Sequence, residues 1–140
     1  YVDIVNSTTG LKSQVLVMHP GGGSSYAVSY TAQKICESFR GGEKPGVVLI
    51  GHFHKLSVNL IRGIWAIQVG CGQDQTPWAR KKRLDPQIGG IIMELEQDPE
   101  TGAFISCKTE IKRFFNRGYY NNRWSPHGEP VMPKQDVNQG

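Results

Sequence analysis

Val47-Val48-Leu49-Ile50-Gly51-His52-Phe53-His54 is the stretch around which the rest of the chain is organised. Its first four residues are apolar and follow Pro45-Gly46, which predicts a short strand buried on both faces. Gly51 permits a sharp turn at the end of this strand because it has no Cβ. The i, i+2 spacing of His52 and His54 lets both imidazoles point to one side. Imidazole is the commonest protein metal ligand, and ligands bind beyond the carboxyl ends of strands in open α/β sheets, so the stretch predicts a metal site.

A third histidine follows a second strand of the same kind. Val15-Leu16-Val17-Met18 is another short apolar run, and His19 comes directly after it, before Pro20-Gly21-Gly22-Gly23. A His-x-His pair alone also arises by chance. The repeated order of strand, histidine and glycine strengthens the metal interpretation, because it would place three imidazoles at one rim of one sheet.

The remaining sequence predicts an α/β fold with a β-rich bias, since seventeen glycines and eight prolines favour strands and turns over a helical bundle. A helix is expected from a cap at Ser24 or Ser25 to about Phe39, stopped by Gly41-Gly42. Its apolar face would consist of Val28, Ala32, Ile35, Cys36 and Phe39. Besides 47–50, strands are expected at 2–5, 13–18, 56–61, 64–70, 90–96 and 103–113. The side chains expected to face the core from the last strand are Ile105, Cys107, Thr109 and Ile111.

Composition sets broad limits on location and partners. A net charge of +4 and a pI near 9.1 favour a polyanionic partner such as DNA or RNA, although surplus lysines also serve solubility. Three cysteines without Cys-x-x-Cys spacing argue against a disulfide framework and predict a reducing, cytoplasmic location. No apolar run approaches 18 residues, so no membrane association is expected.

The segment between residues 70 and 83 offers candidate substrate contacts. Residues 70–78 are expected to form a polar loop that folds back over the metal rim. The dense charge run 80–83 is either a solvated helix face or a contact to phosphates. Trp78 would stack on a base or anchor the core. The residues that we expect to bind substrate are Gln73, Gln75, Thr76, Arg80 and Lys81.

The two histidine-containing elements resemble the last two conserved blocks of the calcineurin-like metallophosphoesterase superfamily. These elements are His19-Pro20-Gly21-Gly22 and Gly51-His52-Phe53-His54, and the second is the more specific. Gln73 to Trp78, with the following Arg80-Lys81-Lys82 and Gly89-Gly90, is similar to an archaeal and phage subset of that superfamily. The resemblance covers roughly residues 13–96. It implies a two-sheet β-sandwich flanked by helices in four layers.

The resemblance also implies a binuclear centre. His19 and His52 would ligate one divalent metal ion and His54 the other, the ions being Mn, Fe, Zn or Ni. The superfamily's earlier blocks, Asp-x-His, Gly-Asp-x-x-Asp and Gly-Asn-His, have no counterpart in this sequence. Residues 1–113 are therefore expected to be the carboxyl-terminal half of a metallophosphoesterase domain. The catalytic residues would lie in the amino-terminal half, and the 140-residue chain alone would be inactive.

Residues 114–140 are expected to form an aromatic and basic arm with a disordered end. The function expected for the whole is metal-dependent hydrolysis of a phosphoester, with a nucleic-acid phosphodiester as substrate and the amino-terminal half or another subunit as partner. Two alternatives stay open. One is a non-catalytic nucleic-acid-binding or polymerase-associated subunit of the same fold, and the other is a structural zinc site formed by the three histidines with Cys71.

Overall fold

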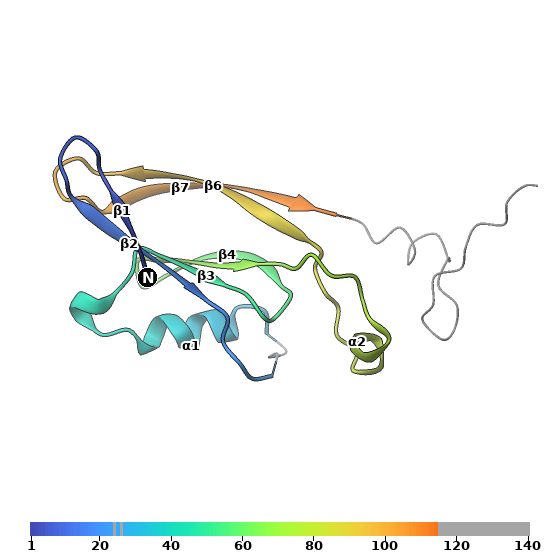
Figure 1. The fold of residues 1–140 in the computed structure, drawn as a ribbon. Coiled ribbons are helices and arrows are strands. Elements are labelled where there is room, and N and C mark those ends of the chain that lie inside the picture. The colour runs from blue at the N-terminus through green and yellow to red at the C-terminus, as the bar shows by residue number, and fades with distance from the viewer. Residues whose placement is uncertain (24, 26, 115–140) are drawn as a thin grey trace, which may run out of the picture.

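The computed structural model describes residues 1–23, 25 and 27–114 of the chain. The described residues form a mixed α/β fold with few helices (Figure 1). Its elements in chain order are β1 (Val2–Val5), β2 (Lys12–Met18), α1 (Tyr30–Ser38), the 3-10 turn η1 (Gly41–Glu43), β3 (Val47–Ile50), β4 (Leu56–Ile61), β5 (Ile64–Val69), α2 (Pro77–Lys81), β6 (Gly89–Gln97) and β7 (Phe104–Arg113).

The strands form one five-stranded sheet, in the order β1-β2-β3-β5-β4, and a separate two-stranded sheet of β6 and β7. Strands β2, β3 and β5 are parallel neighbours, while β1 and β4 run antiparallel at the two edges. The predicted hairpins at 2–18 and 56–70 are confirmed. The predicted β-α-β unit is confirmed too, since α1 connects the parallel strands β2 and β3.

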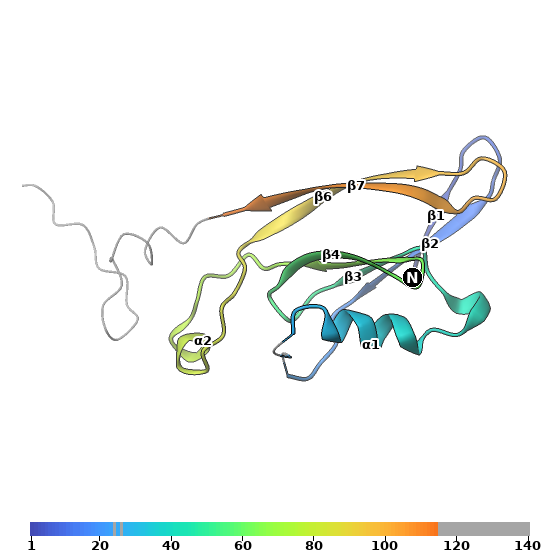
Figure 2. The same cartoon turned by 180° about the vertical axis from the view of Figure 1, so that it is seen from behind.

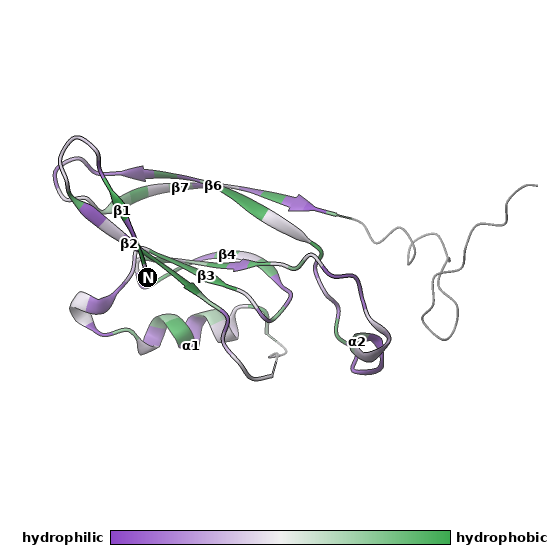
Figure 3. Ribbon diagram, viewed as in Figure 1, coloured by the Kyte–Doolittle hydropathy of each residue, from purple (hydrophilic) through white to green (hydrophobic). Residues whose placement is uncertain are grey.

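The central sheet is covered on both faces. Figures 1 and 2 show α1 on one side of the five-stranded sheet and the β6–β7 hairpin on the other. Figure 3 shows apolar residues concentrated along the strands of the central sheet. The core under the helix is formed by Ala32, Cys36, Val48, Ile50, Ile64 and Ala66. The core under the hairpin is formed by Val15, Val47 and Ile67, with Ile91, Met93, Leu95 and Phe104 packed against them.

Helix α1 begins later than the sequence predicted. Its first residue is Tyr30, Ser29 occupies the cap position without a side-chain hydrogen bond, and Val28 lies before the helix and is exposed. The expected start at Ser24 or Ser25 is therefore wrong. The carbonyl of Val28 accepts a hydrogen bond from the buried amide of Gln68 at 2.7 Å, which keeps this residue in the loop. Ala32 and Cys36 do lie on the buried face, as predicted.

The end of α1 is held by a residue from a distant hairpin. Arg62 Nη1 donates to the carbonyls of Cys36, Glu37 and Phe39 at 3.2, 3.1 and 3.3 Å. The last carbonyls of a helix lack intrahelical donors, and a cation there interacts favourably with the helix dipole. Arg62 therefore joins the β4–β5 turn to the end of α1.

Strand β7 departs from the simple alternation that the sequence predicted. The pairing with β6 shifts between Glu96 and Gln97, so Gln97 lies opposite Phe104 while Ile105 has no partner. This bulge turns Phe104 toward the core and leaves Ile105 exposed at 57%. The expectation that Ile105 and Ile111 are buried is wrong, because both side chains are exposed. The expectation that Cys107 faces the core is confirmed in part, since Cys107 is partly buried and packs against the core under the hairpin.

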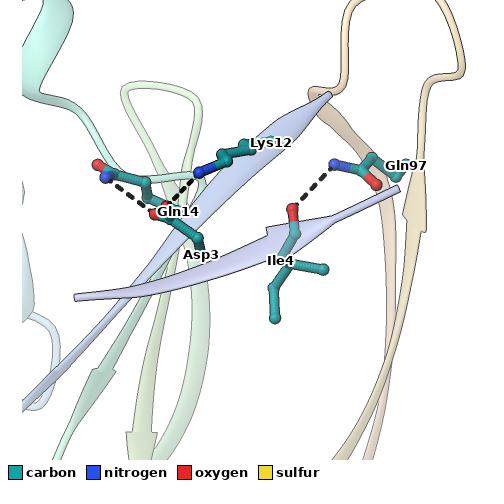
Figure 4. Close-up of polar contacts among 5 residues, drawn as sticks. All are labelled: Asp3, Ile4, Lys12, Gln14 and Gln97. Atoms are coloured by element: carbon teal, nitrogen blue, oxygen red, sulfur yellow. Dashed lines mark hydrogen bonds and ion pairs between the residues drawn. The ribbon is translucent and has the colours of Figure 1, made fainter. Parts of the chain in front are cut away.

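The two sheets are joined by hydrogen bonds at one end. Gln97 Nε2 of β6 donates to the carbonyl of Ile4 at 3.4 Å, and Figure 4 shows this contact beside the side chains that join Asp3 to β2. The hydroxyl of Ser13 donates to the carbonyl of Gly102 in the β6–β7 loop. These bonds fix the hairpin over the sheet at the end where β1 meets β2.

The remaining predictions concern membrane spans, the cysteines and the segment after β7. Within the described residues, no helix is both long and apolar enough to cross a membrane. All three cysteines are free thiols, as expected from their spacing. Phe114 is exposed after β7. The predicted arm at 114–140 otherwise lies outside the described residues, because residues 115–140 are not among them.

Candidate metal centre and adjacent pocket

Two of the predicted ligands lie side by side at the ends of parallel strands. Met18, the last residue of β2, pairs with Ile50, the last residue of β3, so His19 and Gly51 leave the sheet together. The amide of Gly51 donates to the carbonyl of Met18 at 3.0 Å. A Cβ on Gly51 would lie 3.0 Å from His19 Nδ1. Glycine at position 51 therefore leaves room for the imidazole of His19.

The imidazoles of His19 and His52 face each other through their nitrogens. His52 Nδ1 lies 3.3 Å from His19 Nε2, and the rings meet edge to face with centroids 5.1 Å apart. His52 Nε2 lies 2.9 Å from the carbonyl oxygen of Gly22. A carbonyl only accepts, so Nε2 of His52 carries the hydrogen. A neutral His52 therefore directs the lone pair of Nδ1 toward His19.

This pair of nitrogens fits one metal ion. Two ligand nitrogens bound to the same ion at about 2.1 Å and at the tetrahedral angle lie about 3.4 Å apart. The observed separation of 3.3 Å is close to that value, and without an ion it is also the length of a hydrogen bond from His19 Nε2 to His52 Nδ1. Metal-bound histidines usually donate their other ring hydrogen to a carbonyl or carboxylate, and the contact from His52 to Gly22 is of that kind.

His54 lies near the pair but does not join it. It lines the same pocket as His52, and its backbone carbonyl accepts from the amide of Gln87 at 2.8 Å. Its imidazole forms no hydrogen bond with any described residue. In the part of the chain that the structure describes, no group of three or more His, Cys, Asp or Glu side chains is placed to hold a metal. The structure thus brings two predicted ligands together and leaves the third on the pocket wall.

Cys71 is not among the residues that line the pocket beside His52 and His54. Its single S–H is shared between the carbonyl oxygens of Gln73 and Gln87, which lie 3.4 and 3.6 Å from the sulfur. Burial raises the pKa of the Cys71 thiol above its usual value. Structural zinc prefers four closed ligands, a set that the described residues do not gather here.

Both histidines of the Gly-His-x-His block have left-handed backbones. The φ angles of His52 and His54 are 75° and 53°. This conformation costs an L-residue about 1–2 kcal/mol, and such residues concentrate at functional sites. Phe53 between them packs against the helix-side core, as predicted, and its ring contacts that of His52 edge to face. The core therefore fixes Phe53, and the strained backbone turns the histidines outward.

A pocket of about 600 Å³ opens beside the histidines. Its walls come from three segments, namely the glycines after His19, the residues following β3, and the loop that contains α2. Among the residues that line it are Gly22, His52, His54, Lys55, Gln73, Asp74, Thr76, Trp78, Lys82 and Asp85. The size lies within the range of small-molecule sites.

The predicted substrate contacts divide into two groups. Gln73 and Thr76 line the pocket, whereas Gln75, Arg80 and Lys81 do not. The hydroxyl of Thr76 accepts from the amide of Ala79 at 3.1 Å and so caps α2. The amide of Gln75 donates to the carbonyl of Leu84 at 2.9 Å and closes the loop. The side chains of Gln75 and Thr76 thus stabilise the loop. Contacts of the five predicted residues with substrate stay a prediction.

Two basic residues of the pocket were missed by the sequence analysis. Lys82, rather than Arg80 or Lys81, is the member of the charge run that lines the pocket, and Lys55 lines it directly after His54. Lys82 lies four residues after Trp78, a spacing that puts two side chains on one side of a helix. That spacing was the available signal. No local pattern marks Lys55 apart from its place beside the histidine block.

Comparisons with models of protein families, with curated proteins and with solved structures found no match to this chain. The resemblance to metallophosphoesterases therefore rests on the motif residues themselves. The geometry of His19 and His52 is an independent observation beside it.

Proposed function

We propose that this chain takes part in metal-dependent hydrolysis of phosphoesters, with a nucleic-acid phosphodiester as the substrate. The single observation that carries the proposal is the 3.3 Å separation between His19 Nε2 and His52 Nδ1 at the ends of β2 and β3. The proposal extends to the four-layer metallophosphoesterase fold. Packing of the β6–β7 hairpin on the five-stranded sheet supports a two-sheet arrangement.

The residues present would divide the work as follows. His19 and His52 would hold one divalent ion, and the carbonyl of Gly22 would keep His52 in the tautomer that binds through Nδ1. His54, with its imidazole on the pocket wall, would serve a second ion. Bound divalent ions would supply Lewis-acid stabilisation of phosphate charge and lower the pKa of a bound water. Lys55, Gln73 and Lys82 surround the space in which the phosphoester would lie.

Phosphate binding that depends on metal tests this proposal. Calorimetric titration with Mn²⁺ should give binding that is lost in His19→Ala and in His52→Ala, because each removes half of the nitrogen pair. Inorganic phosphate should bind only when Mn²⁺ is present. Cys71→Ser is the matched control and should bind both like the wild type. Equal phosphate affinity with and without Mn²⁺, or Mn²⁺ binding that survives in both histidine variants, would overturn the proposal.

Turnover is a separate expectation. We expect these 140 residues to hydrolyse a simple phosphodiester negligibly, since the described residues bring together only two imidazoles and no bridging carboxylate. The readout is release of nitrophenolate from bis(4-nitrophenyl) phosphate with Mn²⁺. Metal-dependent release that disappears in His52→Ala would mean that the chain contains a complete catalytic set.

One observation favours the non-catalytic alternative. Trp78 and Lys82 provide an aromatic surface and a cation on the pocket wall without any need for metal. A nucleic-acid-binding subunit of this kind would bind nucleic acid equally well in wild type and His52→Ala and would bind no phosphate with Mn²⁺. The calorimetric experiment therefore separates the two functions.

A further inference from the structure

Trp78 is an aromatic side chain on the pocket wall with no place in the core. It is 64% exposed and lines the pocket from α2. The sequence left open whether this residue anchors the core or stacks on a base. The apolar cores under α1 and under the hairpin do not include it. An exposed indole on a pocket wall presents a flat surface on which a planar ligand can stack.

Lys82 lies one helical turn after Trp78 in the same wall. The amide of Lys82 donates to the carbonyl of Trp78 at 3.0 Å, which fixes the two residues relative to each other. Thr76 caps the start of α2, and the left-handed backbone of Arg83, with a φ of 56°, ends it. The loop thus holds an indole and an ammonium group together on one side of the pocket.

The charges of the pocket argue against a ligand held mainly by electrostatics. Lys55 and Lys82 are matched by Asp74 and Asp85, so the lysines and carboxylates of the lining balance. A polyphosphate or a stretch of duplex backbone would meet two carboxylates as well as two ammonium groups. A ligand that combines one flat ring with one nearby phosphate fits this wall better. An unpaired nucleotide within a strand has that chemistry.

We infer that the pocket accepts one unpaired nucleobase, which stacks on Trp78 while a neighbouring phosphate contacts Lys82. The preferred ligand is then single-stranded nucleic acid, because bases inside a duplex are stacked on each other and cannot reach a protein pocket without flipping out. The inference names the substrate class of the proposed phosphoesterase and rests on that function. Stacking and the lysine contact themselves require no metal.

The test is fluorescence anisotropy of labelled oligonucleotides in the presence of EDTA. Wild-type protein should bind (dT)8 more tightly than a fully paired DNA hairpin of equal phosphate number. Trp78→Leu should weaken (dT)8 binding by about 5- to 150-fold, since stacking on one aromatic is worth roughly that much, while Trp78→Phe should retain most of the affinity. Comparing the affinity for (rU)8 with that for (dT)8 shows whether the protein prefers single-stranded RNA or single-stranded DNA.

Lys82 and its neighbour Lys81 provide a matched pair of charge variants. Lys82→Ala should reduce the slope of log affinity against log salt by about 0.7, the value for one phosphate contact on a single strand. Lys81→Ala removes the same charge from a residue outside the pocket lining and should leave the slope nearly unchanged. Circular dichroism of each variant checks that the fold is retained, as expected for exposed positions.

Three results would overturn the inference: equal affinity for (dT)8 and the hairpin, affinity of Trp78→Leu within twofold of the wild type, or equal effects of the two lysine variants. Each of these is measured without metal. Failure of metal-dependent phosphate binding with a normal Trp78 effect would refute the phosphoesterase proposal alone, and the reverse pattern would refute only the single-strand inference.

Discussion

The two ends of the sheet use left-handed backbone in different ways. At one end, Arg62 and Gly63 have φ angles of 52° and 77° and join β4 to β5 in a two-residue turn. Positive φ at both positions matches the twist of the flanking strands, so the hairpin itself accounts for the conformation. At the other end, His52 and His54 have φ angles of 75° and 53° in a loop that is no hairpin.

What compensates for the strain differs between these two regions. The two hydrogens of Arg62 Nη1 are shared among three carbonyls at the end of α1, which offsets the cost of its conformation. The imidazole of His54 has no hydrogen-bond partner among the described residues. The comparison teaches that contacts within the fold compensate for the backbone of Arg62 and, through the hydrogen bond to Gly22, for that of His52, whereas the strain at His54 has no such compensation.

The largest effect is expected from alanine substitution of two glycines, Gly51 in the histidine region and Gly63 in the β4–β5 turn. Gly51→Ala would force the imidazole of His19 to shift by a few tenths of an ångström, so we expect a loss of roughly 10- to 100-fold in Mn²⁺ affinity, as for other disturbances of a ligand's support. Gly63→Ala meets no atom within 4 Å but has a φ of 77°, so it should reduce the free energy of unfolding and leave metal affinity unchanged. Calorimetry and urea denaturation measure the two quantities, and a reversed pattern would break the comparison.

The second prediction measures the strain at His54 directly. His54→Gly should be more stable than His54→Ala by about 0.5–1 kcal/mol, because glycine avoids the left-handed penalty and this gain exceeds its greater entropy in the unfolded state. Urea unfolding of the two variants gives the difference. If alanine proved the more stable, the backbone at position 54 would not be strained as described.

A smaller effect is expected at Arg62. Arg62→Ala should lower the free energy of unfolding by about 0.5 kcal/mol through loss of the favourable charge at the end of α1, the side chain being exposed to solvent. Arg62→Lys keeps the charge without the planar donor group and should recover only part of this loss. Thermal unfolding at low and high salt is the measurement. Equal stability of the wild type, Arg62→Ala and Arg62→Lys would show that the contacts of Arg62 with α1 do not offset the cost of its backbone conformation.

The smallest effect concerns Asp3 on the edge strand β1. A hydrogen bond from the amide of Gln14, followed by one from Lys12, holds the pKa of the Asp3 carboxyl below its usual value. A carboxyl with a lowered folded-state pKa contributes stability above its unfolded pKa of about 3.9, and this contribution is lost as pH falls through the folded value. An NMR titration of the Asp3 carboxyl should show the lowered midpoint, and Gln14→Ala should move it back toward the usual value more than Lys12→Ala does.

Much of the fold could be predicted because its signals are local. Short apolar runs with flanking glycine or proline marked β3 and the β4–β5 hairpin, and Met18 and Ile50 at strand ends indicated that His19 and His52 would meet. The late start of α1 could not be predicted, since it depends on the hydrogen bond from Gln68 to Val28 across the structure. Likewise, the bulge that exposes Ile105 depends on how β6 and β7 pair.

The candidate site was predictable to a similar extent. Residue type and spacing identified the histidines but gave no information about their backbone strain or the tautomer set by Gly22. The choice of Lys82 over Lys81 as a pocket residue depends on the rotation of α2 about its axis, which the cap at Thr76 and the turn after Lys82 set in the folded chain. Sequence patterns therefore indicated the chemistry, and the packing of the loops decided which residues take part.

The most direct test of the metal centre is an anomalous difference map from crystals soaked with Zn²⁺. We predict a zinc peak about 2.0–2.1 Å from both His19 Nε2 and His52 Nδ1, with His52 Nε2 still bonded to the carbonyl of Gly22. A map at saturating Zn²⁺ with no peak between these nitrogens, or with its main peak on Cys71, would contradict the assignment of this histidine pair as a metal centre.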